Sequence, residues 1–152
     1  MSRPGTRAQR FAITLLGLLL AAEGAGKLAD PHGYLEALAR FDALPESWLR
    51  AAATAWMAVE LAAGAGLAYA GLASRPSRRP SLAAAFAGLA AWLAYAALLY
   101  SAYVRKLAIA DCTFFGAFVP ARLSLWPLAQ LAILLALASF EASRIARWPN
   151  AK

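Results

Sequence analysis

Three ionisable residues lie inside apolar stretches of this sequence, where a charged side chain is costly and is therefore a candidate for function. Glu23 and Lys27 are about one helical turn apart near the end of the first stretch, and Glu60 lies about nine residues into the second. If both stretches cross a bilayer, the two carboxyl groups share a layer roughly 10 Å below the outer surface. Lys27 can then reach either carboxyl group.

Two interpretations of this layer stay open. A buried ion pair between the lysine and one glutamate would fix the packing of the first two helices without any chemistry. Alternatively, Glu23, Lys27 and Glu60 form a polar patch at the floor of an outward-facing cavity, which could bind a quinone head group, position a thiol partner or relay a proton. Exchange of Glu60 for glutamine separates the two, because loss of activity in a normally assembled protein excludes a purely structural role.

The single cysteine, Cys112, is the second chemical candidate. Without a second cysteine in the chain, it can act only through a mixed disulfide with another protein. Asp111 beside it disfavours the thiolate, whereas Arg105 and Lys106 would favour it if the loop folded back. The residues alone favour an inert cysteine in a membrane-dipping loop.

The single histidine, His32, is expected to be an exposed loop residue. A metal or haem site needs more ligands than this chain offers, so we expect no metal and no evident cofactor.

The elements that must position these residues are apolar. Of the 152 residues, 62% are hydrophobic and 15% are charged, which is typical of membrane proteins. Four stretches, roughly residues 11–28, 51–72, 82–104 and 125–146, are long enough for a bilayer core of about 30 Å. The predicted fold is an all-α integral membrane protein, a four-transmembrane-helix bundle forming one domain over residues 1–152. The first span is expected to be retained, because Glu23 and Lys27 stand where a signal-peptide cleavage site would be.

A short amphipathic helix is predicted at the membrane interface between the first two spans. Apolar residues recur at helical spacing over residues 34–41, Asp30 can cap the helix, and Pro31 suits its first position. We expect this helix to end near Pro45.

The net charge of +7 does not indicate nucleic-acid binding, because the basic residues gather between the spans. Arginines precede the first span, recur within residues 74–80 and lie at the end of the last span. The positive-inside rule therefore places both termini in the cytoplasm and the two longer loops outside, in a multi-pass protein of a bacterial-type cytoplasmic (inner) membrane. The expected partners are the lipid bilayer and other membrane or periplasmic proteins, with no nucleic acid.

The order of several short motifs resembles the methylamine-utilisation MauE family, within the wider DoxX-like group of four-helix membrane proteins. The motifs are Gly24–Asp30 at the end of the first span, Phe41–Pro45 in the following loop, Val59–Leu61 with Gly64 in the second span, and Asp111–Gly116 before the last.

The family pattern in the last of these loops is similar to Cys-Gly-Cys-Phe-Gly. Cys112 matches the first cysteine, Phe115 and Gly116 match the closing pair, and Phe114 stands in place of the second cysteine. In that family the paired cysteines imply electron exchange with periplasmic thioredoxin-like proteins. Here Asp111, Phe115 and Gly116 retain the outer-loop motif, but Cys112 is its single thiol. A two-cysteine relay within the chain is therefore excluded.

Three functions follow from these observations. The first is a non-catalytic accessory or assembly subunit of a larger membrane complex, because the scaffold is retained and the paired redox cysteines that an enzyme would need are not. The alternative is a redox-associated membrane protein that assists thiol–disulfide exchange or maturation of periplasmic partners through Cys112. A small transporter is the weakest of the three, because two intramembrane acids and no visible inverted repeat offer little support.

Overall fold

The computed structural model describes residues 6–74, 76–107 and 125–148, and these form five helices. In chain order they are α1 (Arg7–Ala29), α2 (Pro31–Arg40), α3 (Glu46–Leu72), α4 (Arg78–Val104) and α5 (Leu125–Ile145). The helices α1, α3, α4 and α5 are long and apolar enough to cross a membrane, and α2 lies between the first two of them. The predicted all-α membrane fold, with four spans and one short helix, is confirmed.

The observed helix boundaries differ from the predicted ones where polar residues extend a helix. Both α3 and α4 begin before the predicted spans, because hydropathy does not register a polar first turn. Pro80 lies in the first turn of α4, where a missing N–H breaks no intrahelical bond. The prediction that α2 continues to Pro45 was wrong, since α2 ends at Arg40 and Pro45 instead precedes the first turn of α3.

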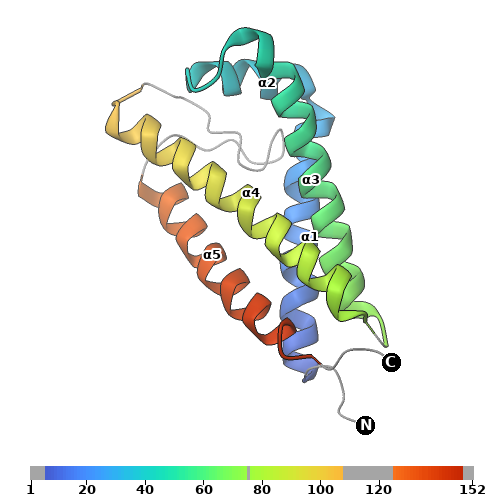
Figure 1. Cartoon of the computed structure of the whole chain (residues 1–152). Coiled ribbons are helices and arrows are strands. Elements are labelled where there is room, and N and C mark those ends of the chain that lie inside the picture. The colour runs from blue at the N-terminus through green and yellow to red at the C-terminus, as the bar shows by residue number, and fades with distance from the viewer. Residues whose placement is uncertain (1–5, 75, 108–124, 149–152) are drawn as a thin grey trace.

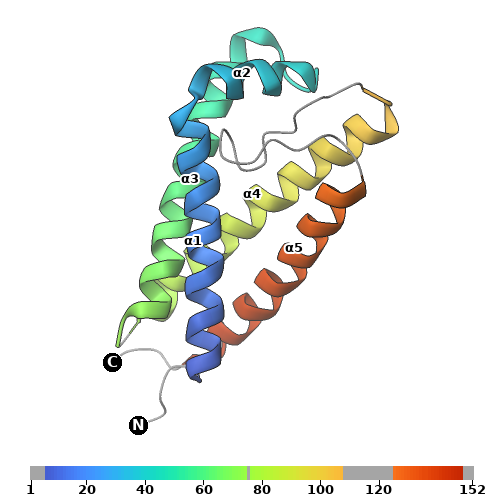
Figure 2. The ribbon, with the colours of Figure 1, turned by 180° about the vertical axis from the view of Figure 1, so that it is seen from behind.

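The long helices form two pairs. Figures 1 and 2 show α1 beside α3 over most of their lengths, and α4 beside α5. The second pair leans away from the first toward the end of the bundle at which α2 lies. The short helix α2 lies across the end of the first pair, where α1 ends and α3 begins.

The pair α1 and α3 packs through glycines that bring the two backbones together. A Cβ atom added to Gly17 would lie 2.4 Å from the backbone nitrogen of Ala68, and one added to Gly64 would lie 2.5 Å from that of Ala21. Membrane helices lack the hydrophobic driving force of water, so close contact between small residues is a main source of their association. The glycines therefore fix which faces of α1 and α3 meet.

Arg10 ties the opposite end of the same pair. Its Nε donates to the carbonyl of Gly71 at 2.9 Å, and its Nη2 donates to the carbonyls of Leu72 and Ala73 at 2.8 Å each. The last carbonyl groups of a helix have no partner within it and carry a partial negative charge. Arg10 of α1 thus caps α3.

Arg105 caps the end of α2 in the same way. The chain leaves α4 through Lys106, whose φ is 54°, with its N–H bonded to the carbonyl of Tyr103 at 3.1 Å. The Arg105 guanidinium donates to the carbonyls of Phe41 and Asp42 at the end of α2. This basic residue, which the sequence places on the predicted outer face, therefore holds α2 against the end of α4.

Candidate functional site

The structure brings the three predicted intramembrane residues into one buried cluster. Glu23 and Lys27 on α1 are 0% exposed, and Glu60 on α3 is 1% exposed. Glu23 and Lys27 lie in the last turns of α1, which face the middle of α3, where Gly24 lies against Glu60 and Leu61. The sequence therefore located a charged layer that the fold assembles.

Lys27 and Glu60 form a buried ion pair that links α1 to α3. The Lys27 ammonium donates to Glu60 Oε1, which also accepts a hydrogen bond of 2.8 Å from the indole Nε1 of Trp56. The ammonium lies 5.5 Å from the ring centroids of Tyr34 and of Tyr95. An aromatic face attracts a cation, and more strongly in a desolvated site. Carboxylate and aromatic rings together replace the water that the ammonium has lost.

Glu23 bonds to a tryptophan and not to Lys27. Its two carboxylate oxygens accept from the indole Nε1 of Trp92 on α4, at 3.1 and 2.9 Å. Trp92 itself is 1% exposed. Lys27 is therefore bonded to Glu60, and Glu23 is bonded across the bundle to the second helix pair.

Sequence reasoning missed these two tryptophans. A tryptophan in an apolar span also fits a lipid-facing position, so its type alone gave no sign of a role. The signal that was present is the spacing of Trp56 and Glu60, four residues apart on one helix face, where an indole donor can reach the carboxylate.

Two polar atoms of the cluster are buried without a hydrogen-bond partner in the part of the chain that the structure describes. They are Oε2 of Glu60 and the hydroxyl of Tyr34, which projects from α2 and is 2% exposed. Burial, with a smaller contribution from nearby Glu60, raises the pKa of the Tyr34 hydroxyl above its ordinary value. The hydroxyl thus stays protonated and can donate as well as accept. Buried polar groups are almost always paired, so open positions on two residues that both contact the Lys27 ammonium invite a ligand or water.

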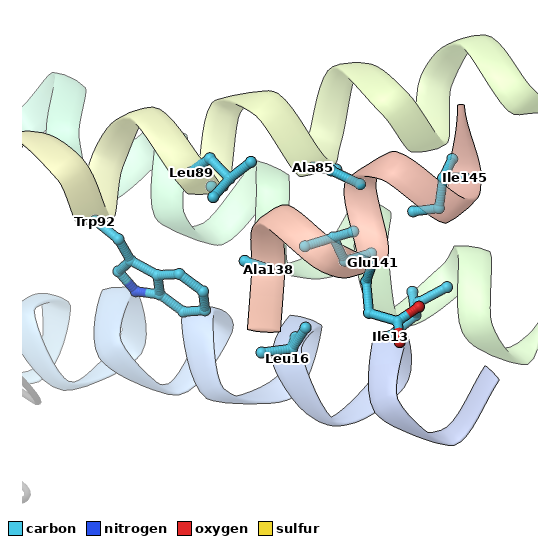
Figure 3. Close-up of a pocket in the computed structure, with 11 residues that line it drawn as sticks. Ile13, Leu16, Ala85, Leu89, Trp92, Ala138, Glu141 and Ile145 are labelled. Atoms are coloured by element: carbon cyan, nitrogen blue, oxygen red, sulfur yellow. The ribbon is translucent and has the colours of Figure 1, made fainter. Parts of the chain in front are cut away.

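Sequence reasoning also missed a third buried carboxyl group, Glu141 on α5. It is 6% exposed, and Arg144 Nη1 lies 3.4 Å from its Oε1, while its Oε2 has no partner among the described residues. Figure 3 shows it among apolar side chains of α1 and α4, beside Ile13. The cavity that they line measures about 10 Å³, which is about the space one water molecule needs. Glu141 is near the end of the last span and one turn before Arg144, a position that is also typical of surface residues.

The remaining predicted residues have other placements. Cys112, Asp111, Phe115 and Gly116 lie outside the residues that the structure describes. His32 is 87% exposed, as expected, although it lies in the first turn of α2 rather than in a loop, 3.3 Å from Glu36. Within the described ranges, no three histidine, cysteine, aspartate or glutamate side chains gather as a metal site would require.

The charged cluster therefore combines two carboxyl groups, one ammonium group and two indole donors from α1, α3 and α4, with Tyr34 of α2 against the ammonium. Comparison with curated proteins and with solved structures finds no match. A family model does match, over residues 7–143, which takes in the first three spans, most of the fourth and the segment that contains Cys112. The chain belongs to the family described as methylamine utilisation protein MauE.

Proposed function

We propose that this chain is a non-catalytic accessory or assembly subunit of a larger membrane complex, in a bacterial-type cytoplasmic membrane. The proposal rests on the partners of the buried charged residues, which lie on neighbouring helices of the same bundle. Lys27 bonds to Glu60 across α1 and α3, and Glu23 bonds to Trp92 across α1 and α4. Buried pairs of this kind can specify how helices dock, at little gain in stability. The charges here serve the packing of the bundle.

The shape of the molecule supports the same role. In the described part of the chain, α2 is the one helix outside the four spans. A partner would therefore meet the chain mainly through lipid-facing helix surfaces and through α2. Helices within a bilayer associate by close packing and interhelical hydrogen bonds, so such contacts can be stable without a soluble domain.

Purification from the native membrane tests the proposal. We expect the tagged chain, extracted in a mild detergent, to carry the same partner chains in a fixed ratio from one preparation to the next. The Cys112→Ser variant should retain those partners in the same ratio. Recovery of the chain by itself after in-membrane cross-linking would contradict an accessory role.

A redox-associated role is the second candidate, and Cys112 is the observation that favours it. It precedes α5 in the sequence, at the position of the first cysteine in a sequence pattern similar to Cys-Gly-Cys-Phe-Gly. Its thiolate would attack a partner disulfide, forming a mixed disulfide and releasing one partner thiolate. The test is labelling of Cys112 by a membrane-impermeant maleimide, with trapping of the mixed disulfide. If Cys112→Ser leaves the maturation of partner proteins unchanged, the thiol mechanism is excluded.

A further inference from the structure

An apolar groove lies between α3 and α4, in the half of α3 that begins near α2. Its volume is about 240 Å³, and its lining residues are Ala52, Ala55, Trp56, Val59, Ala91 and Ala94. Four of the six are alanines, and both helices are predicted to cross the membrane at this level. This volume is just below the ~300–1,000 Å³ range of drug-sized small-molecule sites. Its lining suits a hydrocarbon chain.

One residue of the groove also belongs to the charged cluster. The Trp56 indole is half-buried, donates its Nε1 hydrogen to Glu60 Oε1 at 2.8 Å, and packs edge-on against Tyr95 with centroids 6.1 Å apart. Tyr95 in turn lies beside the Lys27 ammonium. A single layer of aromatic rings therefore separates the lipid-facing groove from the buried charges.

Beyond that layer lie the two unpartnered polar atoms, Glu60 Oε2 and the Tyr34 hydroxyl. Glu60 Oε2 accepts hydrogen bonds, and the neutral Tyr34 hydroxyl can donate one. The group that completes both is another hydroxyl, which donates to the carboxylate and accepts from the phenol. A charged head group would add a further charge to a cluster that already holds an ion pair.

We propose that the α3–α4 groove and the Glu60–Tyr34 pair together bind a membrane amphiphile that consists of an apolar chain and a hydroxyl head group. The chain lies along the alanines of the groove, and the hydroxyl reaches Glu60 and Tyr34 past the edge of Trp56. The inference does not depend on the accessory role, because a subunit of a complex and an isolated protein could both hold such a molecule.

A photoreactive long-chain alcohol tests the site. The probe is hexadecanol with a mid-chain diazirine, and its methyl ether is the matched compound without the hydroxyl donor. With the purified full chain in lipid nanodiscs, we expect the alcohol to label α3 and α4 at the groove in a saturable manner. The ether should need a concentration about 2- to 10-fold higher, the effect of one lost hydrogen bond.

The variant Tyr34→Phe tests the head-group contact without disturbing the fold. Because the Tyr34 hydroxyl has no partner among the described residues, its removal should leave thermal stability unchanged. The alcohol concentration that gives half-maximal labelling should rise about 2- to 10-fold, toward the concentration that the ether needs. If alcohol and ether label the groove equally in both proteins, the two polar atoms are bound to water alone and the head-group contact is disproved.

Groove-filling variants test the chain contact. Ala55→Leu and Ala94→Leu place larger side chains in the groove, and both positions are exposed, so the bundle should assemble. Each should reduce labelling at α3 and α4 at least about 5-fold. Ala132→Leu, at an exposed position of α5, is the control and should label as the native chain does. Labelling that is uniform over all lipid-facing helices and insensitive to Ala55→Leu would overturn the proposal.

Discussion

At the level of single residues, two indole N–H groups determine how the charged cluster is held. A carboxylate deep in a bilayer needs donors, and water is scarce there. Glu60 receives Lys27 and Trp56 on one oxygen, whereas Glu23 relies on Trp92 for both of its oxygens. Glu23 is therefore the more vulnerable of the two acids, because Trp92 is the one donor that bonds to it in the described structure.

The Trp92→Phe variant should therefore destabilise the bundle. It keeps an aromatic ring in the core but removes the hydrogen-bond donor, which leaves a buried carboxyl group unpaired at a cost of about 1–3 kcal/mol. Equilibrium unfolding by SDS titration in mixed micelles measures the change. Trp48→Phe is the control, since Trp48 is 66% exposed, and it should change stability by less than about 0.5 kcal/mol. Equal stability of the two variants would show that the Trp92 hydrogen bonds contribute nothing.

The residues of this cluster could be predicted only in part. Glu23, Lys27 and Glu60 were found because a charge in an apolar run is conspicuous. Their pairing could not be found, because Lys27 can reach Glu23 one turn away on α1 or Glu60 on the neighbouring helix. Only the rotation of α1 against α3 selects Glu60. The burial of Glu141 was not predicted, because a carboxyl group near the end of a span can lie at the surface as well as in the core.

At the level of helices, the close contact of α1 and α3 sets the geometry that the cluster requires. Gly17 and Gly64 face each other, and either added Cβ would meet the backbone of the opposite helix rather than a side chain that can move. The sequence predicted the helices by length and hydropathy, but it could not predict which glycines lie at the interface, because the pattern of small residues runs along several faces of these alanine-rich helices.

Gly64→Val should consequently weaken the α1–α3 pair. The added Cβ would lie 2.5 Å from the Ala21 backbone nitrogen, so the helices must separate, at a cost of about 1–3 kcal/mol or more. The same unfolding titration measures the loss. Ala65→Val, at the neighbouring exposed position, introduces the same β-branched side chain without an interhelical contact and is expected to be nearly neutral. A neutral Gly64→Val variant would mean that α1 and α3 are less closely packed than described.

At the level of the whole molecule, the arrangement of basic residues predicts the orientation of the bundle. The positive-inside rule places the α3–α4 connection in the cytoplasm and the α2–α3 connection outside. Arg105 and Lys106 are basic residues on the side predicted to be outside, where the rule does not expect them. The structure gives Arg105 a packing role at the end of α2, which accounts for a basic residue on that side without any bearing on orientation.

Single cysteines in a Cys112→Ser background test this orientation. Ser47→Cys, at the start of α3, should react with a membrane-impermeant maleimide in intact cells, and Ser74→Cys should react only after the membrane is permeabilised. Both positions are exposed, so a difference in labelling reports the side of the membrane and not burial. The reverse pattern of labelling would invert the predicted topology.

The central structural claim is that the interior charges hold the bundle together as bonded pairs. A double-mutant cycle on Lys27→Met and Glu60→Gln, measured by equilibrium unfolding, tests it most directly. Each single variant leaves a buried group without its partner, and the double variant removes both, so the account predicts a favourable coupling energy of about 1–3 kcal/mol between Lys27 and Glu60. A coupling energy within about 0.3 kcal/mol of zero would contradict it.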